Sequence, residues 1–189
     1  MLKPISRSLR HKRGFTLVEV LVTIAIVAVL AGVLLPALFN QLGRGDTGRL
    51  AQDLGNLRTG VETFGSDTHR LPANVSQLIS AITTSDADIN ALSFTAPIVA
   101  RWKGPYVNRD VVAATGGGTF STNFVLVAGT NGTNYLSTKV TGLSFQDFGQ
   151  IEAILDEGNT STSTSSTSGS VRYSTTNSTL TFLMVPVPT

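Results

Sequence analysis

The residue best placed to do chemistry in this sequence is Glu19, because it is the single charged residue in the apolar run of residues 15–39. A carboxylate in a lipid-facing helix costs about 2.5–3.5 kcal/mol on insertion scales, so its presence there requires an explanation. Just before the run, Gly14 separates a basic segment from Phe15. Glycine leaves the backbone open to a peptidase, and a cut after Gly14 would create an ammonium group about one helical turn from the Glu19 carboxylate.

The apolar run is long enough to cross a membrane as one helix. Its 25 residues span about 37 Å, whereas a bilayer core is about 30 Å thick. A basic flank favours the cytoplasmic side, so we expect the N-terminus inside and the remaining chain outside. The flank, residues 1–14, contains no acid and five basic residues, namely Lys3, Arg7, Arg10, Lys12 and Arg13.

The candidate cleavage position differs from that of an ordinary secretory signal. Such a signal ends its apolar stretch with small residues of the Ala-x-Ala kind. Here the run ends in Leu35-Pro36-Ala37-Leu38-Phe39 and continues into a polar segment. The better candidate therefore lies before the run, at Arg13-Gly14-Phe15.

Composition limits the partners and the chemistry. The 189 residues suffice for one domain, and the absence of cysteine excludes disulfides and thiolate chemistry. The formal net charge is +2, but removing residues 1–14 leaves nine basic and twelve acidic residues, a net charge of −3. The basic pI therefore belongs to the leader and is no argument for nucleic-acid binding.

The rest of the pattern predicts an α+β fold, with a long N-terminal helix whose second half packs on a small antiparallel sheet. We expect a leader (1–14), a transmembrane helix (15–39), its amphipathic continuation (40–66) and an extracytoplasmic globular domain (67–189). Three glycines should weaken the helix across residues 40–48. Alternating and periodic patterns predict strands at 124–128, 135–140, 171–174 and 180–185, and short helices at 76–82 and 144–155.

The segment Arg13-Gly14-Phe15-Thr16-Leu17-Val18-Glu19 resembles the class III signal of type IV pilins and type II secretion pseudopilins. The likeness runs from the basic leader through the apolar helix and includes Pro36. It implies that a membrane-embedded prepilin peptidase cuts after Gly14 and methylates the new amino group of Phe15. It also assigns Glu19 and Pro36 to assembly, with Glu19 meeting the ammonium of a neighbouring subunit.

Two later segments are similar to major secretion pseudopilins, namely Asp67-Thr68-His69-Arg70-Leu71-Pro72 and Trp102-Lys103-Gly104-Pro105-Tyr106-Val107. The Asp-Pro-Trp-Gly segment and the acidic C-terminal loop of those proteins do not occur, so their calcium site is not expected. Trp102 and Tyr106 are expected to fill the core. Asp156-Glu157-Gly158-Asn159 offers oxygen ligands for Ca²⁺, but its spacing is not an EF-hand and fits an ordinary turn.

The sequence thus predicts a structural subunit of a type II secretion pseudopilus or type IV pilus-like filament, with no enzymatic activity, cofactor or metal. The partners implied by the resemblance are the prepilin peptidase, copies of the chain and related pseudopilins, and an inner-membrane assembly platform. The expected location is the inner membrane, single-pass, with the filament in the periplasm or at the cell surface. The alternative is a membrane-anchored extracytoplasmic module that binds DNA or a glycan.

Overall fold

The computed structural model describes residues 14–108, 118–129, 132–156 and 169–187. The chain divides into two compact units, Met1–Gln41 and Leu42–Thr189. The long helix α1, Leu17–Thr68, contributes residues to both units.

The described part of the first unit is apolar and exposed. Leu17–Leu35 has a mean hydropathy of 2.8 with none of it buried, and is long and apolar enough to cross a membrane. A cleaved signal near an N-terminus passes the same test of length and composition, so the assignment needs the motif described below. Every large hydrophobic side chain along this stretch would face lipid or another helix in a membrane.

The backbone of α1 is helical through residues 40–48, and the expectation that its glycines weaken the helix there stays a prediction. Glycine costs a helix about 1 kcal/mol relative to alanine, but flanking residues that pack on the core offset that cost. Thr47 within this stretch and Leu50 just after it are buried. A Cβ atom at Gly45 or Gly48 would meet nothing within 4 Å, so packing does not require glycine at either position.

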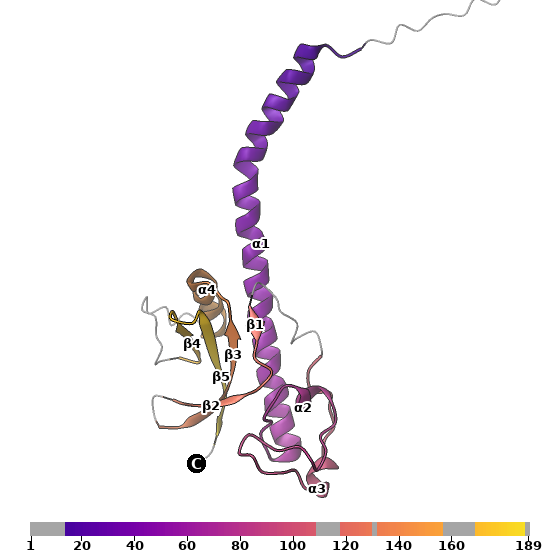
Figure 1. Cartoon of the computed structure of the whole chain (residues 1–189), viewed down its shortest axis with the longest axis vertical. Helices are drawn as coiled ribbons and strands as arrows, with labels where there is room; N and C mark the ends of the chain where they lie inside the picture. Colours follow the sequence, from indigo (N-terminus) through magenta and orange to yellow (C-terminus); the bar gives the residue numbers. More distant parts are fainter. Residues whose placement is uncertain (1–13, 109–117, 130–131, 157–168, 188–189) are drawn as a thin grey trace, which may run out of the picture. The chain divides into compact units, whose positions relative to one another are not determined.

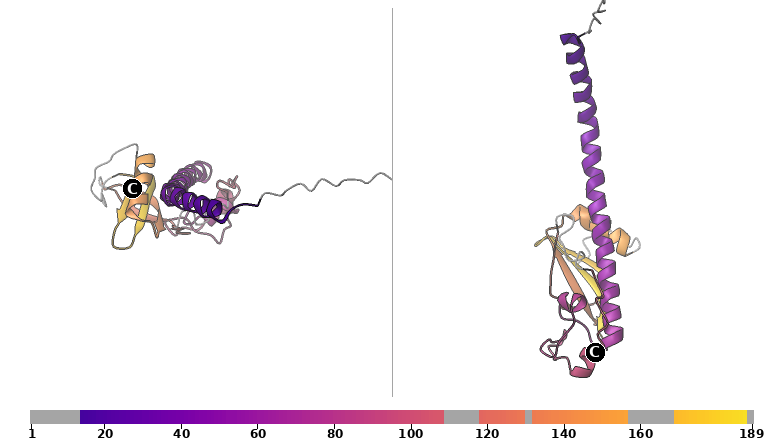
Figure 2. Two further views of the ribbon diagram at one scale, coloured as in Figure 1. Left: turned by 90° about the horizontal axis from the view of Figure 1, so that it is seen from above. Right: turned by 90° about the vertical axis from the view of Figure 1, so that its right-hand side faces the viewer.

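The second half of α1 holds the core of the second unit. One helical face is buried, with a spacing of three and four residues that matches the helical period. The sheet lies along this half of the helix (Figures 1 and 2), and both contribute to one hydrophobic cluster. The helix residues of that cluster are Leu50, Ala51, Leu54, Leu57, Val61 and Phe64.

All strand pairs of the sheet are antiparallel, in the order β1-β3-β5-β4, and β2 pairs with the other half of β3. The strands are β1 Thr119–Phe120, β2 Val125–Ala128, β3 Asn134–Thr141, β4 Val171–Ser174 and β5 Thr179–Val187. An irregularity in the register beside Leu136 and Ser137 leaves Met184 unpaired with β3. The predicted α+β class, a long helix on a small antiparallel sheet, is confirmed.

Three short helices complete the second unit, namely α2 Ser76–Ile79, α3 Ala96–Val99 and α4 Phe145–Leu155. α4 begins with a capping box between Ser144 and Asp147, and Thr47 of α1 donates a hydrogen bond to Gln150 at 2.7 Å. Sequence patterns located α4 and four of the strands to within two residues. They missed β1, because two residues are too short to show a period, and they made α2 three residues too long.

Candidate functional site

The N-terminal motif is open on all sides in the isolated chain. Gly14, Phe15 and Thr16 precede α1 and are not helical, and the Phe15 side chain is 87% exposed. A Cβ atom at Gly14 would meet nothing within 4 Å. The Gly14–Phe15 peptide bond is therefore accessible, and folding places no demand on residue 14.

Glu19 and Thr16 form a reciprocal capping box at the start of α1. The Glu19 amide donates to Thr16 Oγ1 at 3.2 Å, while the Thr16 amide and hydroxyl donate to Glu19 Oε2 at 3.2 and 3.1 Å. Such a box satisfies amide groups that the first turn of a helix leaves without partners. We did not predict this role for Thr16, although Thr-x-x-Glu before an apolar run is its known sequence signal.

Three of the four predicted site residues lie together. Gly14, Phe15 and Glu19 occupy the first turn of α1 and the residues before it. Pro36 lies in the helical backbone directly after Leu17–Leu35, about 25 Å further along at 1.5 Å per residue. Proline has no amide hydrogen, so the helix lacks one backbone hydrogen bond at the end of its apolar span.

The end of α1 brings together the two segments that resemble secretion pseudopilins. Tyr106 Oη donates to Asp67 Oδ2 at 3.0 Å and accepts the Lys103 amide at 2.9 Å, while Lys103 Nζ lies 3.4 Å from Asp67 Oδ1. Tyr106 also packs edge-on against Phe64 and Trp102. Both Trp102 and Tyr106 pack against the core, as predicted.

Burial is the main cause that raises the pKa of Tyr106 above its ordinary value of 10.0, and the Asp67 carboxylate adds to it. Glycine at position 104 is required by the same cluster, because a Cβ atom there would lie 2.5 Å from the Trp102 ring. The Trp-x-Gly-Pro-Tyr segment thus closes over the end of α1 as a packing unit.

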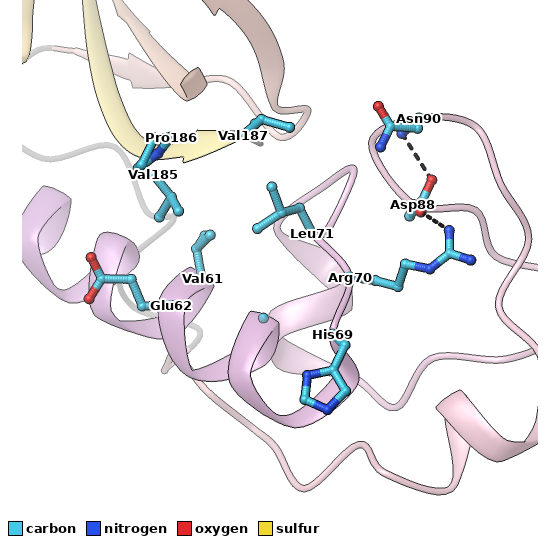
Figure 3. A pocket seen from close by; sticks show the side chains of 11 residues that line it. Val61, Glu62, His69, Arg70, Leu71, Asp88, Asn90, Val185, Pro186 and Val187 are labelled. Atoms are coloured by element: carbon cyan, nitrogen blue, oxygen red, sulfur yellow. Dashed lines mark hydrogen bonds and ion pairs between the residues drawn. The ribbon is translucent and has the colours of Figure 1, made fainter. Parts of the chain in front are cut away.

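A second polar network anchors the loop after α1. Asp88 is 3% exposed and accepts hydrogen bonds from Arg70 at 2.6 Å and from the amides of Asn90 and Leu92, each at 2.9 Å. Figure 3 shows this network at the rim of a groove of about 440 Å³ between α1 and the end of β5. The groove is apolar on the inside, where Val61, Leu71 and Val185 line it.

Among the described residues, no group of three or more His, Asp or Glu side chains could hold a metal ion. The segment considered above as a calcium loop is residues 156–159, and its residues 157–159 lie outside the described residues. Its first residue, Asp156, accepts hydrogen bonds from the Ser170 hydroxyl and from the amides of Ser170 and Val171, so it joins the end of α4 to β4.

A family model matches the N-terminus of the chain, and known proteins resemble the chain over shares of its length such as 28% and 70%. Residues 9–35 match the family model described as the prokaryotic N-terminal methylation motif. The type IV major fimbrial protein FimA of Dichelobacter nodosus is 35% identical over 52 residues, covering 28% of this chain and 33% of FimA. The fimbrial protein EcpC of Eikenella corrodens is 30% identical over 133 residues, covering 70% of this chain and 67% of EcpC.

The chain belongs to the family of type IV pilins and type II secretion pseudopilins. The type II secretion system core protein G of Klebsiella pneumoniae is 27% identical over 101 residues, covering 53% of this chain and 67% of that protein. No solved structure matches the chain. Pilins and pseudopilins are structural proteins, and the motif with its apolar helix indicates a membrane-anchored protein of this type.

The network around Asp88 gives a first prediction. Replacing Asp88 by alanine leaves Arg70 and two amides without their acceptor, so the free energy of unfolding should fall by about 3 kcal/mol. The matched control is Arg58→Ala, which breaks an exposed ion pair with Glu62 at 3.0 Å and should cost less than about 0.5 kcal/mol. Urea unfolding of the detergent-solubilised chain compares the two, and equal losses would show that the network does not anchor the loop.

The raised pKa of Tyr106 gives a second prediction. Above pH 10 the unfolded chain releases the phenolic proton while the folded chain retains it, so stability should fall as pH rises beyond about 10. Tyr106→Phe cannot lose that proton and should flatten this part of the profile. The measurement is the melting temperature between pH 8 and about 11 for both proteins. Profiles of the same slope would contradict the assignment.

Proposed function

We propose that this chain is a structural subunit of a type II secretion pseudopilus or a related type IV pilus-like filament. Prepilin peptidase cuts it after Gly14 and methylates Phe15, and the mature chain remains a single-pass inner-membrane protein until it is assembled. Its partners are then copies of itself, related pseudopilins and the inner-membrane assembly platform. It catalyses no reaction and needs no cofactor. The observation that carries the proposal is the accessible Gly14–Phe15 bond, which lies directly before an apolar helix with Glu19 in its first turn.

The capping box supports two separate roles for Glu19, one in hydrogen bonding within its own chain and one in pairing its charge with a neighbour. One carboxylate oxygen of Glu19, Oε2, accepts hydrogen bonds from the amide and the hydroxyl of Thr16. In the free subunit these bonds reduce the cost of a carboxylate in an apolar segment, because they supply two donors from the chain itself. In the free subunit the carboxyl group is protonated, hydrated at the interface or paired with the chain's own terminus, and each option leaves some cost until a neighbouring subunit brings its Phe15 ammonium close. Assembly in the correct register therefore removes a cost that the single subunit retains.

The glycine-rich stretch supports an extensible helix. Packing does not require glycine at position 45 or 48, as both face open space, and each lowers helix stability by about 1 kcal/mol relative to alanine. The helix is continuous in the free chain, so we propose that it loosens only in the filament, between Pro36 and the residues buried on the core.

Processing is tested at Gly14. A bulky residue there should block cleavage, because a side chain would obstruct the peptidase, whereas the fold should be unaffected since position 14 faces open space. Mass spectrometry of the membrane-extracted protein should show a chain that starts at N-methylated Phe15 for the wild type and an uncut chain for Gly14→Leu. Gly14→Ala, with its small side chain, is the control. A wild-type chain that keeps its leader would refute the proposal.

The role of Glu19 is tested by two variants that separate its charge from its cap. Glu19→Gln removes the charge but can still close a capping box, so filament incorporation should fall at least about tenfold. Thr16→Val removes the cap and keeps the charge, so incorporation should stay within about twofold. Both should be cleaved normally. The measurement is the fraction of each variant in sheared filaments. If Glu19→Gln assembles at the wild-type level, pairing of charges does not drive incorporation.

A further inference from the structure

Among the described residues, the strands place two cations, Lys139 and Arg172, and no acid on the solvent face of the sheet. None of the five strands contains Asp or Glu. Lys139 of β3 and Arg172 of β4 both lie opposite Thr181 of the intervening β5, so they share one face. Strands are about 4.8 Å apart, which places the two Cα atoms about 10 Å from each other.

Two neighbouring hollows of about 270 Å³ each are both lined by Arg172. Lys139 lines one hollow and Arg58 of α1 lines the other, while no acidic residue among those described lines either. We call this surface the sheet groove, defined by Arg58, Lys139 and Arg172.

The cations of the sheet groove make few hydrogen bonds and ion pairs among the described residues of their own chain. Arg172 Nη1 donates to the Ala128 carbonyl at 3.0 Å, but its buried Nε has no hydrogen-bond partner among the described residues. Arg58 pairs through its Nε with Glu62, and its side chain is 49% exposed. Lys139 is exposed. Donors of this kind call for carboxylate or phosphate oxygens as partners.

The same chain carries a surface of opposite character on α4. The helix and its C-cap contain three acids, Asp147, Glu152 and Asp156, and no basic residue. It also exposes two large apolar side chains, Phe145 at 51% and Ile154 at 54%. Burial and the neighbouring Asp156 raise the pKa of Glu152, so a cation placed beside it would relieve a local excess of negative charge.

We propose that α4 of one copy docks on the sheet groove of the next, so that acids and apolar residues of α4 meet Arg58, Lys139 and Arg172 of its neighbour. The two surfaces differ, which makes the contact heterologous, and a heterologous contact that does not close generates an open helical array. Three cations are few for a nucleic-acid site, and the exposed apolar residues of α4 fit a protein interface better. The inference rests on the proposed filament function and adds the surfaces that join its globular units.

A charge swap in the full chain tests the inference. Lys139→Glu and Glu152→Lys each place like charges in contact, so the filament-bound fraction should fall about tenfold for each, and the double variant should recover to within about twofold. Neither substitution changes Asp147, which caps α4, or Asp156, which accepts a hydrogen bond from β4. Arg101→Glu, an exposed residue outside the groove, is the matched control and should assemble normally.

Cross-linking tests the direction of the contact, since the chain has no cysteine of its own. Differently tagged Lys139→Cys and Ile154→Cys chains, assembled together, should yield a mixed cross-linked dimer with a short bismaleimide. Either variant alone should give none. Dimers from one variant alone would indicate an isologous contact and overturn the inference.

The remaining outcomes are also decisive. If wild-type chains form no filament, the proposed function fails and this inference fails with it. If filaments form and all charge variants assemble equally, only the inference fails. If Lys139→Glu instead abolishes binding of a single-stranded oligonucleotide to the detergent-solubilised chain, with filament abundance unchanged, the sheet groove binds a polyanion and the inference is overturned.

Discussion

The carboxylate of Glu19 is the constraint on which the account of this chain depends. It stands in the first turn of a helix whose next stretch is apolar and exposed from end to end. Such a group is costly in a membrane unless hydrogen-bond donors or a positive charge compensate it. Thr16 supplies donors within the chain, and a cut after Gly14 would supply a positive charge at the same end of a neighbouring helix.

The second half of α1 performs a different task from the first. One of its faces is buried under the sheet, and its end is closed by two polar clusters around Asp67 and Asp88. These clusters use side chains from the long loop after the helix, so they fix a segment of about 40 residues that has little regular structure. The globular unit therefore presents a stable sheet with a basic solvent face, and an acidic helix α4 on another part of its surface.

The sequence was most informative where one physical rule dominates. Hydrophobic length located the first half of α1, and a period of three and four residues located Leu50 through Phe64 on its buried face. Strand-like segments between turn signals located β3 and β5 to within two residues. The family likeness predicts roles for Gly14, Phe15, Glu19 and Pro36 that no single contact within the chain tests.

Other features depend on contacts that no local pattern records. The glycines of residues 40–48 predict a weak helix, and the backbone is helical there, with buried residues from Thr47 onward. The bonds from Tyr106 to Asp67 and from Arg70 to Asp88 join residues 39 and 18 positions apart, and only the fold brings them together. The basic face of the sheet is not visible in the net charge of −3 that remains without residues 1–14, because the acids lie outside the strands. The Thr16 cap does have a local signal, Thr-x-x-Glu before an apolar run, which overlaps the cleavage motif.

The central claim is that Glu19 of one subunit meets the amino group of Phe15 of another. The direct measurement is solid-state NMR on filaments assembled from an equal mixture of two labelled chains, one with ¹⁵N in phenylalanine and one with ¹³C in glutamate. The account predicts a cross-peak between the methylated amino nitrogen of Phe15 and the Glu19 carboxyl carbon, which in this mixture can arise only between copies. Filaments that show no such cross-peak, while uniformly labelled filaments show it within one chain, would contradict the account.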